Sequence, residues 1–222
     1  VLRPALGLLL PGLLLLLAGP PRAVATDGGW INNAANSLWS VSANWFGGVV
    51  ASNIDSTAYI TNNISANRSI VIDTKLTNGY LRVGDWDGSN AYTIKTNGAV
   101  GNALTFDVTD GGSAQIYQLS SSKGDTISAS IVLADPLVVG NASTNTLTIS
   151  GGVDAGANRT TFTNEGPVTV SGVIASSGGI TKNDAGVLTL SGDIAGSGNI
   201  TKNDAGVLIT SSAKTFTGTW TL

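Results

Sequence analysis

The sequence predicts an all-β fold, a β-solenoid of stacked coils about 20 residues long. The first observation is a repeat: the nine residues Ile-Thr-Lys-Asn-Asp-Ala-Gly-Val-Leu begin at Ile180 and return at Ile200, a period of 20. The second is the alternation of apolar and polar residues within short runs, which is typical of strands. The third is the Gly, Asn, Asp and Ser between runs, where tight turns need them. A unit this short matches one coil rather than a domain.

Alternation within the repeat predicts which side chains face inward. It places Leu188 and Leu190 on one face of a strand and Val187 and Thr189 on the other. Turn residues then separate this run from the runs before and after it. Each coil is therefore predicted to contain three short strands joined by corners.

Stacking of the coils predicts columns of identical side chains along the solenoid axis. Ile180 is expected beneath Ile200 and Leu188 beneath Leu208, about 4.8 Å apart. Thr210 interrupts one column of leucines. A single coil has too little apolar surface to fold alone, so stability is expected to depend on contacts between neighbouring coils.

The repeat extends upstream as short apolar or β-branched runs at steps of about ten residues. These runs are Ser69–Asp73, Tyr80–Val83, Tyr92–Lys95, Ala103–Asp107, Ala114–Leu119, Thr126–Leu133, Pro136–Val139, Thr146–Ser150, Thr160–Thr163 and Pro167–Ser171. The signature Thr-x-Ser-Gly begins at Thr148, Thr169 and Thr189, with spacings of 21 and 20. We therefore predict eight to ten coils.

Three segments are predicted along the chain. Residues 1–25 have the features of a secretory signal peptide: Arg3, an apolar stretch over Leu6–Ala18, and Ala23-Val24-Ala25 as the cleavage site. The apolar stretch is shorter than the roughly 20 residues that a membrane span needs. Residues 26–68 are predicted to form an amino-terminal cap, and residues 69–222 the solenoid. We expect that the true start is missing and that the chain stops inside a strand.

The predicted cap contains Trp30, Trp39 and Trp45, three of the five tryptophans. Large apolar rings near one end of a solenoid can cover the exposed end of its core. The alternative is a platform on which sugar rings stack, because exposed aromatic faces serve carbohydrate binding. Both interpretations remain open on the sequence.

Charge and composition exclude several classes of protein. Without the signal peptide, nine basic residues face 14 acidic ones, a net charge of −5, which argues against nucleic acid as a partner. The chain contains no cysteine, so an exported form has no disulfide to stabilise it. Abundant turn and strand formers argue against helices.

The segment from Gly178 to Gly192, and its broken copy from Ile200 to Gly218, resemble the autotransporter-associated β-strand repeat of bacterial proteins. Thr215-Phe216-Thr217-Gly218 resembles the end of that repeat, and Trp39–Trp45 resembles the start of such secreted proteins. Asp184 and Asp204 stand where the repeat usually has glycine.

The resemblance implies a right-handed parallel β-helix, the passenger region of a secreted or outer-membrane-displayed bacterial protein. It also implies a carboxyl-terminal translocator or anchor as partner, which this sequence does not include. An adhesive role, with a glycan or cell-surface ligand, is consistent with such a passenger.

Residue types exclude the commonest catalytic sites. The chain has neither histidine nor cysteine, which removes Ser-His-Asp and Cys-His sites and the commonest transition-metal ligands. Ser120-Ser-Ser-Lys123 matches S-x-x-K, but that motif needs a helix and partner motifs that are not found here. We predict that the protein is not an enzyme, and we assign no catalytic, cofactor-binding or metal-binding residue.

The segment Asp85-Trp-Asp-Gly-Ser-Asn90 is the one candidate for a site built on carboxylates. Asp85, Asp87 and Asn90 could hold Ca²⁺ through oxygen atoms, although the EF-hand spacing and its distal Glu are missing. A β-turn is the simpler interpretation. Asp85 and Asp87 are also the nearest carboxylate pair for a glycan-cleaving β-helix.

Two further patterns have structural explanations. Asp184 and Asp204 occupy the same turn position in successive coils, so their carboxylates are expected to cap backbone groups, partly neutralised by Lys182 and Lys202. Glycosylation sequons matter only in a eukaryotic secretory pathway, which the bacterial-type repeat argues against. They begin at Asn63, Asn67, Asn141, Asn158 and Asn199.

Two functional classes remain. The first is a non-catalytic, surface-displayed structural solenoid with an adhesive role. The second is a carbohydrate-active β-helix that binds or cleaves glycans.

Overall fold

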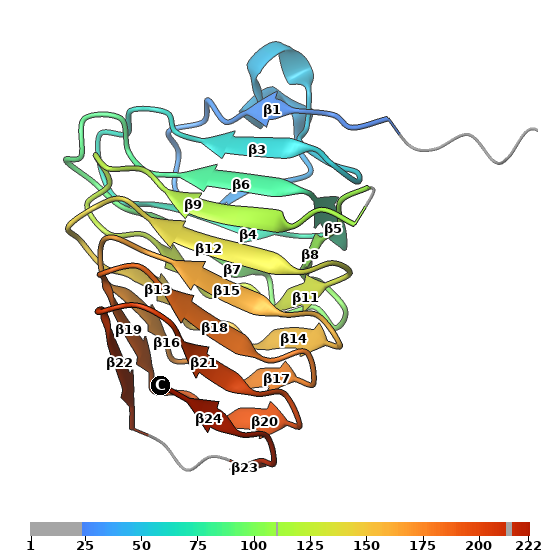
Figure 1. Ribbon diagram of the computed structural model, residues 1–222. Coiled ribbons are helices and arrows are strands. Elements are labelled where there is room, and N and C mark those ends of the chain that lie inside the picture. The colour runs from blue at the N-terminus through green and yellow to red at the C-terminus, as the bar shows by residue number, and fades with distance from the viewer. Residues whose placement is uncertain (1–23, 110, 212–214) are drawn as a thin grey trace, which may run out of the picture.

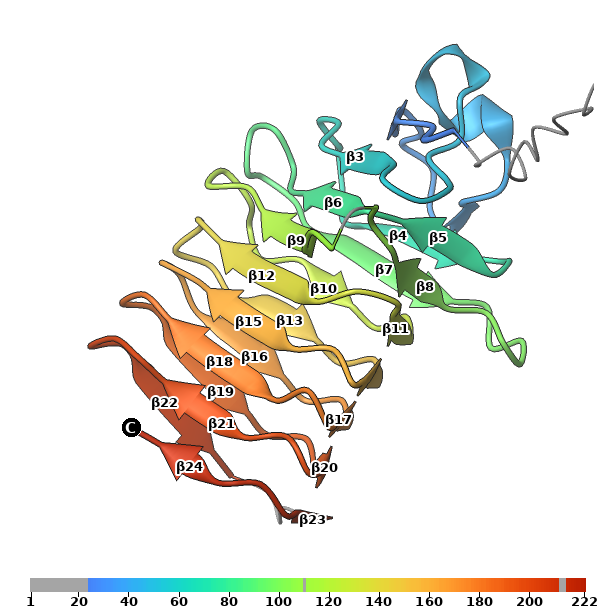
Figure 2. The same cartoon turned by 45° about the vertical axis from the view of Figure 1, so that its right-hand side comes forward.

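The protein is a parallel β-solenoid in a computed structural model that describes residues 24–109, 111–211 and 215–222. The predicted signal peptide lies almost wholly outside these residues. Within them, the strands form three sheets of nine, eight and seven strands, which make three faces of the solenoid (Figures 1 and 2). We name these the front, rear and side sheets after their positions in Figure 1.

Each sheet takes one strand from each coil, and every strand pairing within the sheets is parallel. The front sheet contains β1 (Gly28–Gly29), β3 (Thr57–Ile60), β6 (Tyr80–Val83), β9 (Ala114–Gln118), β12 (Leu137–Asn141), β15 (Thr160–Thr163), β18 (Ile180–Asn183), β21 (Ile200–Lys202) and β24 (Trp220–Thr221). The rear sheet contains β2 (Ser37–Leu38), β4 (Arg68–Ile72), β7 (Tyr92–Thr96), β10 (Thr126–Ile127), β13 (Leu147–Ile149), β16 (Val168–Val170), β19 (Val187–Leu190) and β22 (Val207–Thr210). The side sheet contains β5 (Leu76–Asn78), β8 (Leu104–Phe106), β11 (Ile131–Leu133), β14 (Val153–Gly156), β17 (Ile174–Ser176), β20 (Ile194–Gly196) and β23 (Thr215–Phe216).

The predicted stacking of the repeat is confirmed. Ile180 pairs with Ile200, and Leu188 pairs with Leu208 on the neighbouring strand. The winding is right-handed: the front strands run leftward in Figure 1, the chain returns along the rear, and the coils progress downward. Right-handed crossovers are the rule for parallel strands because of the strand twist.

The number and length of the coils differ from the prediction. There are about seven coils of about 23 residues in the described part, not eight to ten of about 20. The period of 20 holds between Thr160, Ile180 and Ile200. Upstream, Leu137 pairs with Thr160, a step of 23 residues, and Tyr80 pairs with Gln115, a step of 35. Upstream coils are longer because their corners contain additional residues.

One predicted run proves to be two strands in different sheets. The run Thr126–Leu133 is divided, because β10 ends at Ile127 and β11 begins at Ile131. The chain turns a corner between them, where the backbone N–H groups of Ser128 and Ala129 both donate to the carbonyl of Ile94 in the coil before. Apolar periodicity continues through this corner because Ala129 also points into the core, where it is fully buried.

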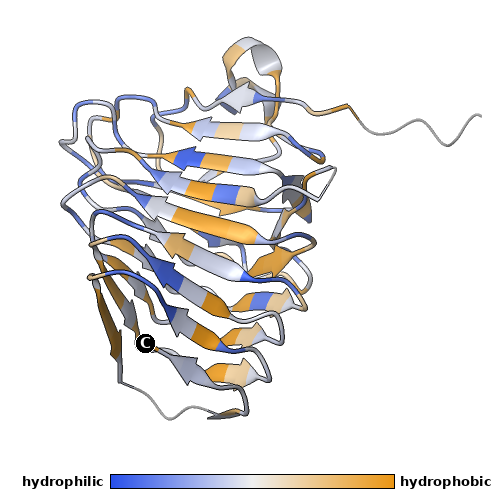
Figure 3. Cartoon of the chain, in the orientation of Figure 1, coloured by the Kyte–Doolittle hydropathy of each residue, from blue (hydrophilic) through white to orange (hydrophobic). Residues whose placement is uncertain are grey.

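The interior is one continuous hydrophobic core along the solenoid axis. Apolar and polar residues alternate along several front strands in Figure 3, whereas β12 is apolar over Leu137–Val139. Buried side chains alternate with half-exposed ones on β6, β9 and β15. One column contains Leu81, Ile116, Val139 and Phe162, which follow one another in register. Because each column is shared between neighbouring coils, the coils stabilise one another.

Lys182, which was expected to partly neutralise the ladder of Asp184 and Asp204, continues that apolar column. It pairs with Phe162 and is buried, and its Nζ donates to the carbonyls of Asn183 and Asp184. Burial lowers the pKa of the Lys182 ammonium. The prediction that the aspartates cap backbone groups is confirmed for Asp204, whose Oδ2 accepts from the Asp184 N–H at 2.9 Å.

The solenoid begins earlier than the predicted boundary at residue 69. Strand β3, within the predicted cap, already pairs with β6, and β2 pairs with β4. The predicted cap therefore contributes the first strands of the sheets as well as two short 3-10 turns, η1 (Ser42–Asn44) and η2 (Phe46–Gly48). The described residues include no helix long and apolar enough to cross a membrane.

The three tryptophans of the cap region form a buried cluster, not a surface platform. Trp30 and Trp39 each contact Trp45 edge-to-face, with ring centroids 5.1 and 4.9 Å apart. The indole N–H of Trp39 donates to the carbonyl of Ala51, and that of Trp45 to the carbonyl of Trp39. All three belong to the core, so their ring faces are not accessible to a sugar.

Candidate functional site

An open groove of about 750 Å³ lies on the outer face of the front sheet. Its lining comes from five successive front strands, β3 to β15, and from the corner that follows β6. Aromatic side chains dominate it: Trp86 is 73% exposed and Tyr59 is 44% exposed. Large exposed aromatic faces are costly to leave in water, so their concentration in one groove marks this as the candidate binding site.

Strand register builds the floor of the groove. Tyr59, Arg82, Tyr117 and Gly140 follow one another in register on β3, β6, β9 and β12. Alternation directs all of these positions outward, because their neighbours in sequence face the core. The floor is therefore a row of side chains parallel to the solenoid axis on a rigid sheet.

The ring of Tyr117 is held between Arg82 and Gly140. The Arg82 guanidinium lies 5.1 Å from the centroid of the Tyr117 ring, a cation–π contact. On the other side, a β-carbon at Gly140 would meet the Tyr117 Cδ2 at 2.8 Å. A side chain at position 140 would therefore displace the ring from the floor.

Arg82 is oriented by a second neutral partner. Its Nη2 donates to the Oε1 of Gln115 at 2.9 Å, and Gln115 also lines the groove. The hydrogen bond and the ring contact together fix the plane of the guanidinium. A fixed planar fork is suited to bidentate recognition of a carboxylate.

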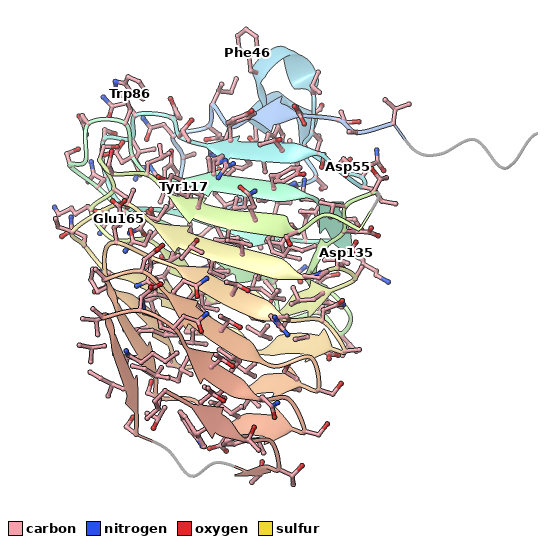
Figure 4. The ribbon with its side chains drawn as sticks, viewed as in Figure 1. Phe46, Asp55, Trp86, Tyr117, Asp135 and Glu165 are labelled. Atoms are coloured by element: carbon pink, nitrogen blue, oxygen red, sulfur yellow. The ribbon has the colours of Figure 1, made fainter. Side chains whose placement is uncertain are left out.

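Trp86 projects from the corner between β6 and β7, at the upper left of Figure 4, and Tyr117 lies below it on the front sheet. Asp85 holds this corner. Its Oδ1 accepts from the Ile64 N–H, and its Oδ2 accepts from the Asn90 N–H, both at 2.9 Å. Buried Asp85 thus fixes the backbone while the next residue faces solvent.

At this corner the structure shows the turn that was the alternative to the calcium hypothesis. Asp85 is fully buried with both oxygens engaged by N–H groups, and the Oδ1 of Asp87 accepts from the Ser89 N–H. That bond lowers the pKa of Asp87 to about 2. Within the described residues, no group of three or more Asp, Glu, His or Cys is arranged to hold a metal ion.

Asp85 and Asp87 do not line the groove either, so they are not placed to act on a molecule bound there. The S-x-x-K segment lies on the corner after β9, not on a helix. Lys123 donates to the carbonyl of Ser89. The segment around Ser120 and Lys123 therefore lacks the helix that this motif requires.

Two buried carboxylates, Asp85 and Asp125, lie near Tyr92. Asp125 accepts from the Tyr92 N–H at 2.8 Å and from the Ser122 hydroxyl. Burial raises the pKa of Asp125 to about 6, although the bonds from Ser122 and Tyr92 oppose this shift. Burial, with Asp85 and Asp125 nearby, also raises the pKa of Tyr92, whose hydroxyl donates to the Asn62 carbonyl.

A further acidic group lies at the opposite corner of the solenoid, where Asp55 and Asp135 are labelled in Figure 4. Asp55 accepts from the N–H and hydroxyl of Thr109, and Asp135 accepts from the Val108 N–H. Burial, then the neighbouring Asp135, raises the pKa of Asp107. These carboxylates fasten a loop to the coil and do not line the groove on the front sheet.

The sequon at Asn141 is buried in a polar column at the front corner. Its Oδ1 accepts from Gln118, and its Nδ2 donates to the carbonyls of Asn145 and Pro167. The side-chain amide of Asn141 is therefore not accessible for glycosylation in the folded chain. The sequon asparagines Asn63, Asn67 and Asn199 are exposed, and Asn158 is half-buried.

Sequence reasoning did not identify the groove residues. Tyr59, Arg82, Tyr117 and Gly140 are spaced by 23, 35 and 23 positions, so a search at a period of 20 does not align them. The available signal was the outward position of bulky residues, Tyr59, Arg82 and Tyr117, on successive front strands.

Comparison of the chain with protein families, with curated proteins and with solved structures finds no match.

Proposed function

We propose that this chain is a non-catalytic solenoid of a secreted or surface-displayed bacterial protein, and that it adheres to glycans through the groove on its front sheet. The observation that carries the proposal is the exposure of Trp86 and Tyr59 beside a fixed polar pair, Arg82 and Gln115. Sugar-binding surfaces combine aromatic faces with a few oriented polar groups in this way.

Binding without cleavage is favoured over the enzymatic alternative by the chemistry of the lining. No Asp or Glu lines the groove, and the whole chain lacks histidine and cysteine. Glycoside hydrolysis generally uses two carboxylates flanking the bond that breaks. The passenger role, with a translocator or anchor outside this sequence, remains a proposal that rests on the repeat at Ile180 and Ile200.

A glycan array probed with the purified chain tests the proposal. We expect binding to a restricted set of polysaccharides and a loss of about tenfold in affinity for Trp86→Ala and Tyr59→Ala, because each stacked ring contributes about 1 kcal/mol or more. Phe46→Ala is the matched control, since Phe46 is 74% exposed but lies outside the groove.

Two results would contradict the proposal. Binding that survives the groove variants but is lost in Phe46→Ala would place the glycan site on the cap. New reducing ends or unsaturated uronates after incubation with plant and microbial polysaccharides would favour the enzyme, particularly if Asp85→Asn or Asp87→Asn abolished their release.

A further inference from the structure

The charge distribution of the groove differs from that of the chain as a whole. The protein is acidic, with 14 acidic residues against 11 basic ones. The groove is lined by one cation, Arg82, and by no carboxylate. Its binding surface is therefore positive within a negative molecule, which favours an anionic occupant.

The Arg82 guanidinium has N–H donors that remain available to a ligand. A guanidinium carries five N–H donors, and the contacts of Arg82 within the described residues are one hydrogen bond to Gln115 and one contact with the Tyr117 ring. Both partners are neutral. A ligand that covers this half-buried cation must supply acceptors, because otherwise the guanidinium loses water without compensation.

We propose that the groove binds a chain of uronic acid sugars, with one carboxylate paired to Arg82 and the sugar rings against Trp86 and Tyr59. This inference rests on the glycan-binding function proposed above. A carboxylate matches the planar fork that Gln115 and Tyr117 hold in place. A neutral sugar could stack on the same rings but would leave the charge of Arg82 unpaired.

The shape of the groove fits an extended chain more closely than a single sugar. It crosses the strands from β3 to β15, which is roughly 19 Å at the usual strand separation. The row of Tyr59, Arg82, Tyr117 and Gly140 runs along the solenoid axis. A polysaccharide lying along that axis would place consecutive rings beside consecutive coils.

Calorimetry with two probes tests the inference: an oligomer of α-1,4-linked galacturonate, and the same oligomer with its carboxylates methyl-esterified. The esters keep the rings and remove the charge. We expect the acid to bind about 10- to 100-fold more tightly, the range that a charge-assisted hydrogen bond supplies. Arg82→Gln should abolish this preference, so that the acid and the ester bind with equal affinity.

The control variant is Arg159→Gln, which removes an arginine outside the groove and should leave the preference intact. Arg82→Lys should retain only part of the preference, since an ammonium lacks the planar fork.

The results separate the inference from the proposed function. Equal affinity for acid and ester, or a preference that survives Arg82→Gln, overturns the uronate inference while glycan binding stands. The uronate inference is likewise overturned if neither oligomer binds but the array identifies a neutral glycan that requires Trp86. If no glycan binds at all, both are overturned.

Discussion

The carboxyl-terminal coils and the amino-terminal coils share one three-strand plan but differ in the regularity of their corners and outer faces. From Thr160 onward the coil step is 20 residues, and the front strands present Thr161, Thr181 and Thr201 in register. Thr169 and Thr189 stack in the same way on the rear sheet. These two outer columns are therefore uniform over these coils.

The amino-terminal coils keep the same kind of apolar core, but they differ in the length of their corners and in their outer side chains. Their steps are 23, 35 and 23 residues. The column of Thr161, Thr181 and Thr201 continues into Val138, Gln115 and Tyr80, beside the column of Tyr59, Arg82, Tyr117 and Gly140. The longest step includes the corner that presents Trp86. The difference teaches that the repeat specifies the core, whereas the candidate site is built where the repeat is broken.

The largest expected effect comes from introducing a charge into a column of the regular coils. Leu188→Asp should abolish soluble folding, because Leu188 is fully buried between Val168 and Leu208 and an unpaired buried carboxylate costs several kcal/mol. Val187→Asp, one position away and facing outward, should change the free energy of unfolding by about 0.5 kcal/mol or less.

Soluble yield and urea unfolding of both variants provide the measurement. Similar losses for the two substitutions would mean that the strand register is shifted by one residue, which would exchange the inner and outer faces.

The second prediction separates structural from functional aromatics within the amino-terminal part. Trp39→Ala should lower the free energy of unfolding by about 3–5 kcal/mol, because it empties the buried tryptophan cluster and leaves the carbonyl of Ala51 without its indole donor. Trp86→Ala should lower it by about 0.5 kcal/mol or less, since Trp86 is mostly exposed.

Thermal and urea melts of these two variants decide the point. A large loss of stability in Trp86→Ala would show that Trp86 packs as core, and would remove the main argument for a ligand at the groove.

The regular part of the fold could be predicted from the sequence because identical residues stack on one another in successive coils. The pairs Ile180 with Ile200 and Leu188 with Leu208 follow from the period of 20 alone. The burial of Lys182 did not follow, because a lysine at an inward position is normally excluded from a core. Its long stem allows Nζ to reach the corner carbonyls, a solution that alternation alone does not reveal.

The candidate site could not be predicted because its residues meet only after unequal corners are counted. The 35-residue step that aligns Arg82 with Tyr117 depends on where the chain turns, and short apolar runs continue through corners such as the one at Ala129. The role of Gly140 depends on a ring from the previous coil. The local sequence therefore predicts the turn that holds Trp86, but not which residues of other coils lie next to it.

The third prediction concerns the buried carboxylate of Asp125. The pKa of Asp125 is raised from 3.8 to about 6 in the folded state, so the folded protein binds the proton more tightly than the unfolded chain does. The stabilisation is complete below roughly pH 4 and is lost as the pH rises through about 6. The expected loss is about 3 kcal/mol.

Urea unfolding from about pH 4 to about pH 8 measures this effect as the difference between the wild type and Asp125→Asn, which cannot ionise. Ser122→Ala should move the loss to higher pH, because the hydroxyl of Ser122 is among the groups that lower this pKa. A difference between wild type and Asp125→Asn that does not change with pH would contradict the raised pKa.

The smallest expected effect tests why the regular coils carry Thr-x-Ser-Gly. A β-carbon on Gly151 would lie 2.0 Å from the Ala129 carbonyl oxygen of the coil before, whereas one on Gly152 would meet the Val173 carbonyl oxygen at an ordinary 3.8 Å. Gly151→Ala should therefore destabilise the protein by about 1–3 kcal/mol. Gly152→Ala should be neutral or stabilising by up to about 1 kcal/mol, because alanine restricts the unfolded chain.

The coil before shows that this requirement belongs to regular stacking and not to the corner itself. Thr126-Ile-Ser-Ala129 has the same signature with alanine in place of glycine, and Ala129 is buried without difficulty beside the irregular corner that follows β7. Alanine is therefore tolerated where the preceding coil departs from the repeat. Chemical denaturation of Gly151→Ala and Gly152→Ala checks the contrast, and equal stabilities would show that neighbouring coils adjust their spacing at this corner, so that the glycine is not required by close approach of the backbones.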